Sequence, residues 1–327
     1  MPYPASGMTL SRRSFVLGLG AAAVSLVGCS STASTQRAST KALKPITVGY
    51  GSLGLNNAPV WVTAEGGYFA KYGLDAKMQY VDPAAVLPAL ASHDLTFSGS
   101  AAGSDIPAQA QNASIKIIGA YIHFPTPALL VQTSIKGAAD LKGKKFAVAQ
   151  GTAEFLAKLG LSKLGLDPRK DLELPRVANG KALLASLQTR AVDGAILSDP
   201  DWRTAVSEGY SLLARLSDLD IKYEQSTLIG NSDHMRANPE VTVNFLKAVT
   251  EGLQRFKQDR EFALQVFTKY QNGNPLSPEL DASYKDAASS WASTLGISLE
   301  GIQTVIDATG SGGKPEDYVD TSYVPWA

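Results

Sequence analysis

Short apolar runs alternate with stretches of helical spacing from Ile46 to about residue 216. This alternation predicts an α/β architecture with largely parallel sheets, because strands that are joined through helices run in the same direction. One helix is expected to begin at Pro59, and further helices cover residues 86–91, 104–111, 153–164, 181–189 and 202–208. The expected strands cover residues 46–50, 76–81, 95–97, 115–121, 128–133, 145–149, 172–177, 194–197 and 212–216.

Beyond residues 225–230 the pattern becomes mainly helical. Residues 238–240 are Asn-Pro-Glu, which predicts a helix start with a capping side chain, a proline in the first turn and an early acid. The apolar residues that follow at helical spacing are expected in the core rather than in a cofactor site. They are Phe245, Val249, Leu253 and Phe256.

The order of these elements predicts two lobes, with the second inserted into the first. Two α/β units are joined by extended strands, and the helical tail returns to the first unit. We expect residues 46–130 and 225–327 to form lobe 1 and residues 131–224 to form lobe 2. Small-molecule sites form preferentially between such lobes, so we expect a ligand cleft there.

Residues 1–28 have the layout of an export signal. The run from Phe15 to Gly28 has 14 uncharged residues and follows Arg12 and Arg13. It is shorter than the ~20 residues that a membrane-spanning helix needs. A basic segment, a short apolar segment and then small residues are typical of a secretory signal. The paired arginines also resemble the twin-arginine export motif.

The only cysteine of the chain ends this signal. Residues 26–29, Leu-Val-Gly-Cys, resemble a bacterial lipobox, whose cysteine is acylated and becomes the new N-terminus. A lipid on Cys29 would anchor the protein to the membrane in the periplasm or at the cell surface, since each buried CH₂ contributes ~0.8 kcal/mol. Residues 29–45 are then the lipidated cysteine and a flexible tether rich in Ser, Thr and Ala. No cysteine follows, which excludes disulfides and cysteine-ligated metals.

The charge balance gives no basis for binding nucleic acid. Removal of residues 1–28 takes away two arginines and no acid, so 28 basic residues remain against 30 acidic ones. No polybasic cluster interrupts this balance. The hydrophobic content of 44% is enough for a real core.

Motifs of catalysis and of metal binding are missing from the sequence. His93, His123 and His234 are the only histidines and lack the spacing of metal ligands, so we expect them to be structural. Residues 137–144 have five residues between their glycines where a P-loop has four, and Lys145 follows where Ser or Thr is required. We therefore expect no cofactor, no metal and no enzymatic activity.

Three predicted strand-to-helix junctions carry small or hydrogen-bonding residues and neither Lys nor Arg. Ligands of doubly wound sheets meet the carboxyl ends of strands and the starts of the following helices. Backbone N–H groups are unpaired there and favour an anion, although plain turn chemistry is the alternative at each junction. The candidate ligand-binding residues are Ser52, Leu53, Asn56 and Asn57, then Ser98, Gly99, Ser100 and Ala101, then Gln150, Gly151 and Thr152.

A fourth junction, residues 199–202, ends another predicted strand. Asp199 either faces the cleft and accepts from an ammonium or hydroxyl group, or caps the helix that follows. Tyr121 and Trp202 are candidate stacking or wall residues of the ligand site. For Trp61 we expect core packing instead.

Four stretches of the chain resemble the substrate-binding proteins of ABC importers for nitrate, sulfonates, taurine, bicarbonate and thiamine-pyrimidine precursors. Their order and spacing match this family across roughly residues 46–325. The stretches are APVWVTAEGGYFAKYGLDAKMQYV (58–81), ALASHDLTFSGSAA (89–102), DLKGKKFAVAQGTAEF (140–155) and AVDGAILSDPDW (191–202).

The resemblance implies a type II periplasmic-binding fold, with hinge strands near 128–133 and 225–230 and a cleft that closes on its ligand. It also implies delivery of the ligand to a membrane permease with a cytoplasmic ATPase. We expect the protein to be a monomer. By position, it places the family's ligand loops at Ser52–Asn57, Ser98–Ala101, Gln150–Thr152 and Asp199.

We therefore expect an extracytoplasmic solute-binding lipoprotein that captures a small organic anion, with sulfonates and taurine favoured. Two alternatives stay open. The first is an enzyme on the same fold that catalyses an elimination or builds a cofactor ring, against which the export signal argues. The second is a receptor that presents its closed form to a membrane sensor, which the sequence does not separate from transport.

Overall fold

The computed structural model of the protein describes residues 42–111, 114–271 and 277–324. The predicted export signal, the lipidation site Cys29 and most of the predicted tether lie outside the described residues. Within the described ranges, no helix combines the length and the apolarity that crossing a membrane requires.

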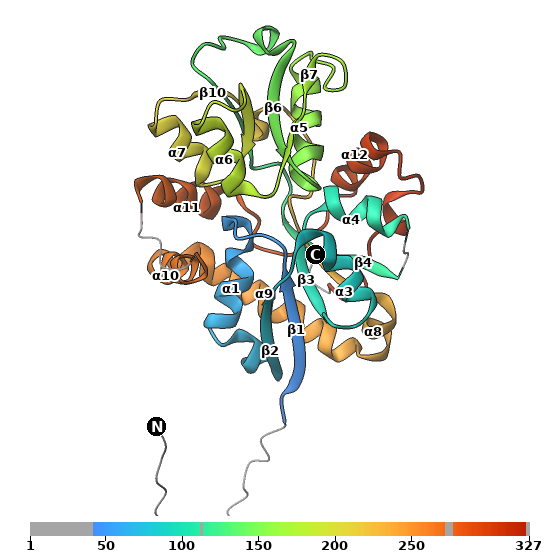
Figure 1. Ribbon diagram of the computed structural model, residues 1–327. Coiled ribbons are helices and arrows are strands. Elements are labelled where there is room, and N and C mark those ends of the chain that lie inside the picture. The colour runs from blue at the N-terminus through green and yellow to red at the C-terminus, as the bar shows by residue number, and fades with distance from the viewer. Residues whose placement is uncertain (1–41, 112–113, 272–276, 325–327) are drawn as a thin grey trace, which may run out of the picture. The chain divides into compact units, whose positions relative to one another are not determined.

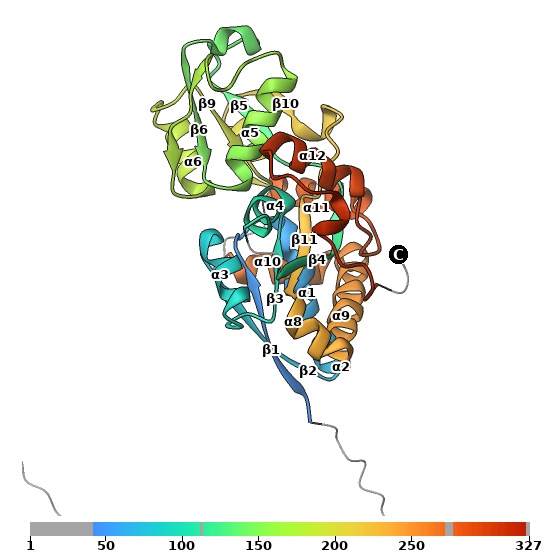
Figure 2. The same cartoon turned by 90° about the vertical axis from the view of Figure 1, so that its right-hand side faces the viewer.

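The first sheet has five strands in the order β2-β1-β3-β11-β4. β1 runs parallel to β2 and to β3, whereas β11 runs antiparallel to its neighbours β3 and β4. Figure 2 shows β11 beside β4, although the two strands are far apart in the sequence. The strands are β1 (Lys44–Tyr50), β2 (Leu74–Tyr80), β3 (Phe97–Ser100), β4 (Ile115–Ile122) and β11 (Ser226–Asn231).

The second sheet has the order β10-β5-β9-β6-β7, and β8 also pairs with β6. β6 runs parallel to β7, β8 and β9, whereas β5 runs antiparallel to β9 and β10. The strands are β5 (Ala128–Val131), β6 (Lys144–Ala149), β7 (Leu172–Glu173), β8 (Arg176–Val177), β9 (Gly194–Leu197) and β10 (Ser211–Arg215).

Both sheets are mixed, which the alternation of strands and helices did not predict. The antiparallel strands are β5 and β11. They are the first strands after the chain crosses to the second sheet and after it returns, and no α-helix lies within either crossing. A strand that enters a sheet without a crossover helix is not constrained to run parallel to its neighbour.

Two expected strands differ from the structure. Residues 172–177 form the separate strands β7 and β8, because Pro175 lies between them and has no N–H to donate to the ladder. The strand expected at 95–97 lies at 97–100 instead, so Ser98, Gly99 and Ser100 belong to β3 and not to a loop.

Helices cover both sheets. Figure 1 shows α5, α6 and α7 beside the second sheet, and α1, α9 and α10 beside the first. The helices are α1 (Ala58–Glu65), α2 (Tyr68–Lys71), α3 (Val86–Ala91), α4 (Ala102–Gln109), α5 (Thr152–Lys163), α6 (Gly180–Gln188), α7 (Asp201–Ser207), α8 (Ser232–Ala237), α9 (Pro239–Gln258), α10 (Arg260–Tyr270), α11 (Pro278–Ser290) and α12 (Leu299–Thr309). Short 3₁₀ turns occur at Leu55–Asn57, Pro83–Ala85, Ala138–Leu141, Leu216–Asp218 and Pro315–Asp317.

The long helix α9 begins where the sequence predicts, with Pro239 at its first position. The expected capping side chain is wrong, because Asn238 makes no side-chain cap bond and its Nδ2 donates to the carbonyl of His234 instead. The side chain is thus turned so that its Nδ2 bonds the preceding helix α8, and its Oδ1 accepts no N–H at the start of α9. The predicted core positions of α9 are confirmed, since all four are fully buried: Phe245, Val249, Leu253 and Phe256.

Core packing is also confirmed for Trp61. Its ring is fully buried in α1 and stacks on Tyr270 of α10, with 4.6 Å between the ring centroids. Phe97 of β3 stacks on Phe245 of α9 at 4.1 Å. These aromatic pairs join α9 and α10 of the helical tail to the N-terminal part of the fold.

A methyl group at position 252 is expected to destabilise the protein. Gly252 of α9 lies against α1, where an added Cβ would sit 2.0 Å from Thr63 Oγ1 and 2.8 Å from Thr63 Cα. Overpacking of this kind costs about 1–3 kcal/mol, and alanine's better helix propensity returns about 1 kcal/mol at most. Denaturant unfolding of Gly252→Ala should therefore show a lower midpoint than the wild type.

The matched control for this variant is Gly296→Ala. No atom lies within 4 Å of a Cβ added at Gly296, and its φ is not in the left-handed region. Its midpoint should equal that of the wild type or lie slightly above it, since alanine reduces the entropy of the unfolded chain. Equal midpoints for both variants would contradict the close packing of α1 on α9.

Candidate functional site

The loop after β1 is held by its own polar groups. Asn57 is almost fully buried, and its Nδ2 donates to the carbonyl of Ser52 at 3.0 Å and to the Ser52 hydroxyl at 2.8 Å. The carbonyl of Leu53 accepts from the side chain of Gln271. Ser52 itself is exposed, and Leu53 is half-buried. The loop is thus fixed in shape while Ser52 still faces solvent.

Tyr121 lies beneath this loop. Its side chain is 1% exposed, and its hydroxyl donates to the carbonyl of Asn56 at 2.6 Å. Ser226 of β11 donates to the same carbonyl at 3.3 Å. Burial raises the pKa of Tyr121 above its usual range. Tyr121 therefore supports the loop from below, because its hydroxyl is already bonded to the chain.

The junction of β3 and α4 contacts the first loop. Ser98 is fully buried, and its hydroxyl donates to the carbonyl of Gly99 at 3.0 Å. A Cβ on Gly99 would lie 2.9 Å from Asn57 Oδ1, so a larger residue there would push against the loop. Ala101 is buried and stands immediately before α4. The junctions at 52–57 and 98–101 are therefore brought together.

A residue that sequence reasoning missed lies at this junction. Asp105, in the first turn of α4, is fully buried. The hydroxyls of Ser100 and Thr227 each donate to one of its carboxylate oxygens. Burial raises the pKa of Asp105 to about 7. The available signal was an acid in the first turn of a helix that follows a predicted ligand junction.

The junction of β6 and α5 connects to α4. Gln150 and Gly151 are exposed, and Gly151 has φ +82°, which a side chain rarely adopts. The hydroxyl of Thr152 lies 2.6 Å from that of Ser104 in the first turn of α4. This hydrogen bond joins elements that flank different sheets. The three junctions without Lys or Arg are therefore linked in series through Asn57, Gly99 and Thr152.

A second contact reinforces this link. The backbone N–H of Gly103 donates to the hydroxyl of Tyr223 at 3.0 Å. The Tyr223 ring in turn stacks on Phe155 of α5, with ring centroids 5.8 Å apart. A Cβ on Gly103 would lie 2.8 Å from the Tyr223 hydroxyl. The first turn of α4 is therefore closely packed against residues of the second α/β unit.

The fourth junction is bonded to α11 and not to these three. Asp199 Oδ1 accepts from Arg203 Nε at 3.0 Å and from the Ser283 hydroxyl at 2.7 Å. It does not cap the next helix, because α7 begins after Pro200 without a side-chain cap bond. A ligand ammonium group at Asp199 would have to compete with Arg203, so this role stays a prediction.

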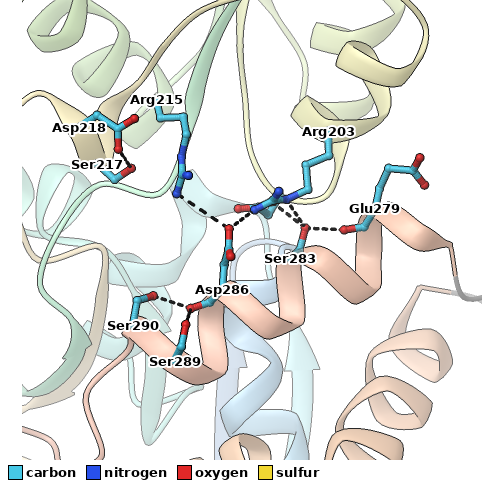
Figure 3. Close-up of polar contacts among 10 residues, drawn as sticks. Arg203, Arg215, Ser217, Asp218, Glu279, Ser283, Asp286, Ser289 and Ser290 are labelled. Atoms are coloured by element: carbon cyan, nitrogen blue, oxygen red, sulfur yellow. Dashed lines mark hydrogen bonds and ion pairs between the residues drawn. The ribbon is translucent and has the colours of Figure 1, made fainter.

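Two arginines converge on α11 beside Asp199. Arg203 donates to Asp286, and Arg215 Nη2 lies 3.9 Å from the same carboxylate oxygen. Figure 3 shows Arg203 of α7 and Arg215 of β10 both pointing toward α11. Trp202 is 6% exposed, with the Arg203 guanidinium 4.2 Å from its ring centroid. Trp202 is therefore covered on that face by the Arg203 guanidinium.

One histidine lies between the two sheets. His123 Nδ1 is 2.9 Å from Glu224 Oε2, and the backbone N–H of Ser298 donates to Glu224 Oε1 at 2.6 Å. The Glu224 carboxylate raises the pKa of the half-buried His123, and burial raises the pKa of Glu224 itself. Both residues stand where the chain crosses between sheets, His123 after β4 and Glu224 before β11.

The other two histidines lie together in the first unit. The rings of His93 and His234 are 6.5 Å apart, and the pKa of His234 is lowered by burial and by its neighbour His93. In the part of the chain that the structure describes, no group of three His, Cys, Asp or Glu residues could hold a metal ion.

Two surface pockets lie away from the predicted junctions. One of about 310 Å³ is lined by residues that include Lys44, Lys71 and Asn244. Another of about 570 Å³ is lined by residues that include Lys158 and Arg169. Neither is lined by a predicted ligand-binding residue, so volume alone does not identify the site. The contacts among the strand-to-helix junctions are the better guide.

Comparison with known families shows where the chain belongs. A family model described as NMT1/THI5 like matches residues 55–263. The chain belongs to the NMT1/THI5-like family. The match includes α1 to α9 and every predicted junction except the first residues of the loop after β1. No curated protein matches the sequence at a significant level.

Solved structures give the fold of this NMT1/THI5-like chain. The alkanesulfonate-binding protein SsuA from Xanthomonas axonopodis pv. citri, bound to MOPS, has a TM-score of 0.69 and 19% identity over 86% of this chain and 97% of that chain. The aliphatic sulphonate binding protein SsuA from Escherichia coli has the same score and identity over 84% and 97%. The nitrate-binding protein NrtA from Synechocystis PCC 6803 has a TM-score of 0.59 and 16% identity over 86% and 92%. The predicted two-lobed periplasmic-binding fold is confirmed.

Proposed function

We propose that the protein is a solute-binding protein of an ABC importer. The observation that carries the proposal is the meeting of three strand-to-helix junctions from the two α/β units, through the Asn57–Gly99 and Ser104–Thr152 contacts. Ligands of open α/β sheets bind at such carboxyl ends of strands. The protein would bind a small molecule there and deliver it to a permease with a cytoplasmic ATPase.

The ligand class that we propose is a small organic anion, with sulfonates and taurine favoured. Two of the structural relatives are described as sulfonate-binding proteins, and one of them holds the sulfonate MOPS. In this chain the start of α5 offers backbone N–H groups beside its junction, whereas the first N–H groups of α4 already donate to other groups of the protein. Arg203 and Arg215 lie next to the fourth junction, where Asp199 and Asp286 pair with them and balance their charge.

We propose further that the protein acts outside the cytoplasm as a lipoprotein. The support is the layout of residues 1–28, with paired arginines before an uncharged run, and the lipobox-like residues before Cys29. We propose that residues 46–130 and 225–327 form lobe 1 and that residues 131–224 form lobe 2. The protein is proposed to act as a monomer. A solute captured outside the membrane can then reach a permease without loss of the carrier.

Two alternatives remain on the same fold. An enzyme would need reacting groups at the junctions, and Asp105, the carboxyl group of the β3–α4 junction, already has both oxygens bonded to protein hydroxyls. A receptor for a membrane sensor would bind ligand in the same way as a transporter component. Product formation from a bound compound would support the enzyme.

A thermal-shift screen of the chain from Ser30 onward tests the proposal. The compounds are alkyl and aryl sulfonates, taurine, nitrate, bicarbonate, aromatic carboxylates and pyrimidines. A ligand at 100 times its Kd should stabilise the protein by about 2.7 kcal/mol, which raises the melting temperature by several degrees. We expect at least one class of small organic anion to do so.

Matched variants decide where such a ligand binds. Gly99→Ala would place a methyl group 2.9 Å from Asn57 Oδ1 and should weaken the shift. Gly137→Ala has open space around the added methyl group and should leave the shift unchanged. Equal shifts in both variants would place the ligand elsewhere, and a screen without any shift would contradict the proposed function.

A further inference from the structure

The carboxylate of Asp105 is a fully buried acid of the candidate site. Its side chain has no exposed surface, and the ion pairs of the described residues do not include it. Its two oxygens accept hydrogen bonds from different strands, one from Ser100 at the end of β3 and one from Thr227 of β11. These strands pair directly, with Ser100 opposite Thr227.

A carboxylate without a cationic partner is energetically unfavourable at this buried position. Burial opposes its ionisation and raises its pKa to about 7. An asparagine has nearly the same shape and could accept from one hydroxyl and donate to the other. Aspartate and asparagine at position 105 therefore differ in the direction of the hydrogen bonds that they form with the two hydroxyls.

The ionised carboxylate fixes that direction at Ser100. An ionised carboxylate can only accept hydrogen bonds. The hydroxyls of Ser100 and Thr227 therefore both donate their single proton to Asp105. Their lone pairs are then the only hydrogen-bonding capacity that remains. Thr227 is buried, whereas Ser100 is half-buried at the strand end beside α4. Ser100 therefore offers its surroundings an acceptor and no donor.

The side chains around Ser100 likewise use their protons in bonds within the protein. Asn57 Nδ2 donates to both oxygens of Ser52, and its Oδ1 lies on the side of Gly99. The hydroxyl of Ser98 donates to the carbonyl of Gly99. The hydroxyls of Tyr121 and Ser226 donate to the carbonyl of Asn56. Among these side chains, only the exposed Ser52 has a hydroxyl proton that these bonds do not use.

We infer that Ser100, oriented by Asp105, accepts a hydrogen bond from a donor on the ligand, such as an ammonium, amine or amide N–H group. Asp105 is then a positioning residue for ligand specificity, since it acts through Ser100 and touches no ligand itself. The inference rests on the proposed function. It places the end of the solute that carries the hydrogen-bond donor against the lobe 1 side of the site. The acidic end is left to backbone N–H groups such as those at the start of α5.

The test compares two pairs of probes that differ only in a donor group. Taurine has an ammonium group that ethanesulfonate lacks, and β-alanine has one that propionate lacks. Calorimetric titration at pH 8, where the carboxyl is ionised, should show tighter binding of the donor-bearing member by about tenfold or more. Asp105→Asn should reduce this preference at least about tenfold, because the amide donates to one hydroxyl and frees its proton. Ser100→Ala should reduce it as well.

The control is Asp193→Asn. Asp193 accepts from the backbone N–H of Lys145 at the opposite end of β6 from the junction, so the preference should be unchanged. Equal binding within each pair by the wild type, or an unchanged preference in Asp105→Asn, would overturn the inference. Screening hits that all lack an N–H or O–H donor would also overturn it. A screen without hits would instead contradict the proposed function.

Discussion

The pair Ser104→Cys and Thr152→Cys is expected to form a disulfide that joins α4 to α5 and stops ligand exchange. The two native hydroxyls lie 2.6 Å apart, so the replacing sulfur atoms start close to bonding distance. The cross-link closes a loop of 48 residues, which stabilises the folded state by up to about 4 kcal/mol in the chain-entropy model. Since the bond ties the two α/β units together, a solute should neither enter nor leave until the disulfide is reduced.

The chain is well suited to this experiment because Cys29 is its only cysteine. With Cys29→Ser in the background, each single-cysteine variant has no partner and is the matched control. Ligand exchange is measured by dilution of the bound complex, with and without reductant. Equal exchange rates in the oxidised and reduced chain would show that binding does not need the units to separate. Failure to cross-link would contradict the observed approach of α4 to α5.

The stability of the wild type relative to Asp105→Asn is expected to fall steeply as the pH rises. Burial raises the pKa of Asp105 to about 7 from a usual value of 3.8. Between these values the folded protein keeps a proton that the unfolded chain has released. The free energy of unfolding therefore decreases by about 1.4 kcal/mol per pH unit, or about 4 kcal/mol in total.

Asparagine does not titrate, so the variant lacks this contribution. At pH 4 both proteins have a neutral side chain at position 105, and their stabilities should be similar. At pH 8 the variant should be the more stable by several kcal/mol, because the wild type then holds a buried charge. Denaturant unfolding of both proteins from pH 4 to pH 8 measures the difference, in which other titrating groups cancel. A difference that is constant with pH would mean that the carboxyl group titrates normally.

These two predictions concern the same small region. Ser104 contacts Thr152 of the second unit, and Asp105 binds Ser100 and Thr227 of the first sheet. Adjacent residues of α4 therefore serve different purposes, one at the contact between units and one beneath the proposed ligand site. A buried charge that lowers stability at neutral pH is what a specificity role would require there.

The outer side of the contact between units has a different chemistry. Arg203 links Asp199 of the second unit to Ser283 and Asp286 of α11. Figure 3 shows the contacts of Arg203 with Ser283 and Asp286. Arg203 and Asp199 are largely buried, whereas Asp286 is half exposed, so the pair with Asp286 is the weaker one in water. The ion pairs of Arg203 therefore orient α7 on α11 more than they stabilise the contact between the units.

Much of the fold follows from the sequence alone. Alternating apolar runs predicted most strands of both sheets, because a side chain that faces the core must recur with the period of its backbone. The helical spacing of Phe245, Val249, Leu253 and Phe256 identified the buried face of α9 for the same reason. Paired arginines before an uncharged run, and one cysteine after it, carry the export prediction without any fold.

Only the tertiary structure decided the partners of the polar groups. Asp105 meets Thr227 across 122 residues, and Asp199 meets Ser283 across 84. The antiparallel course of β5 and β11 likewise depends on how the chain crosses between sheets. Periodicity reports which face of an element is buried, a property of neighbouring residues. A hydrogen-bond partner is set by where distant elements come to lie, and no local pattern encodes that placement.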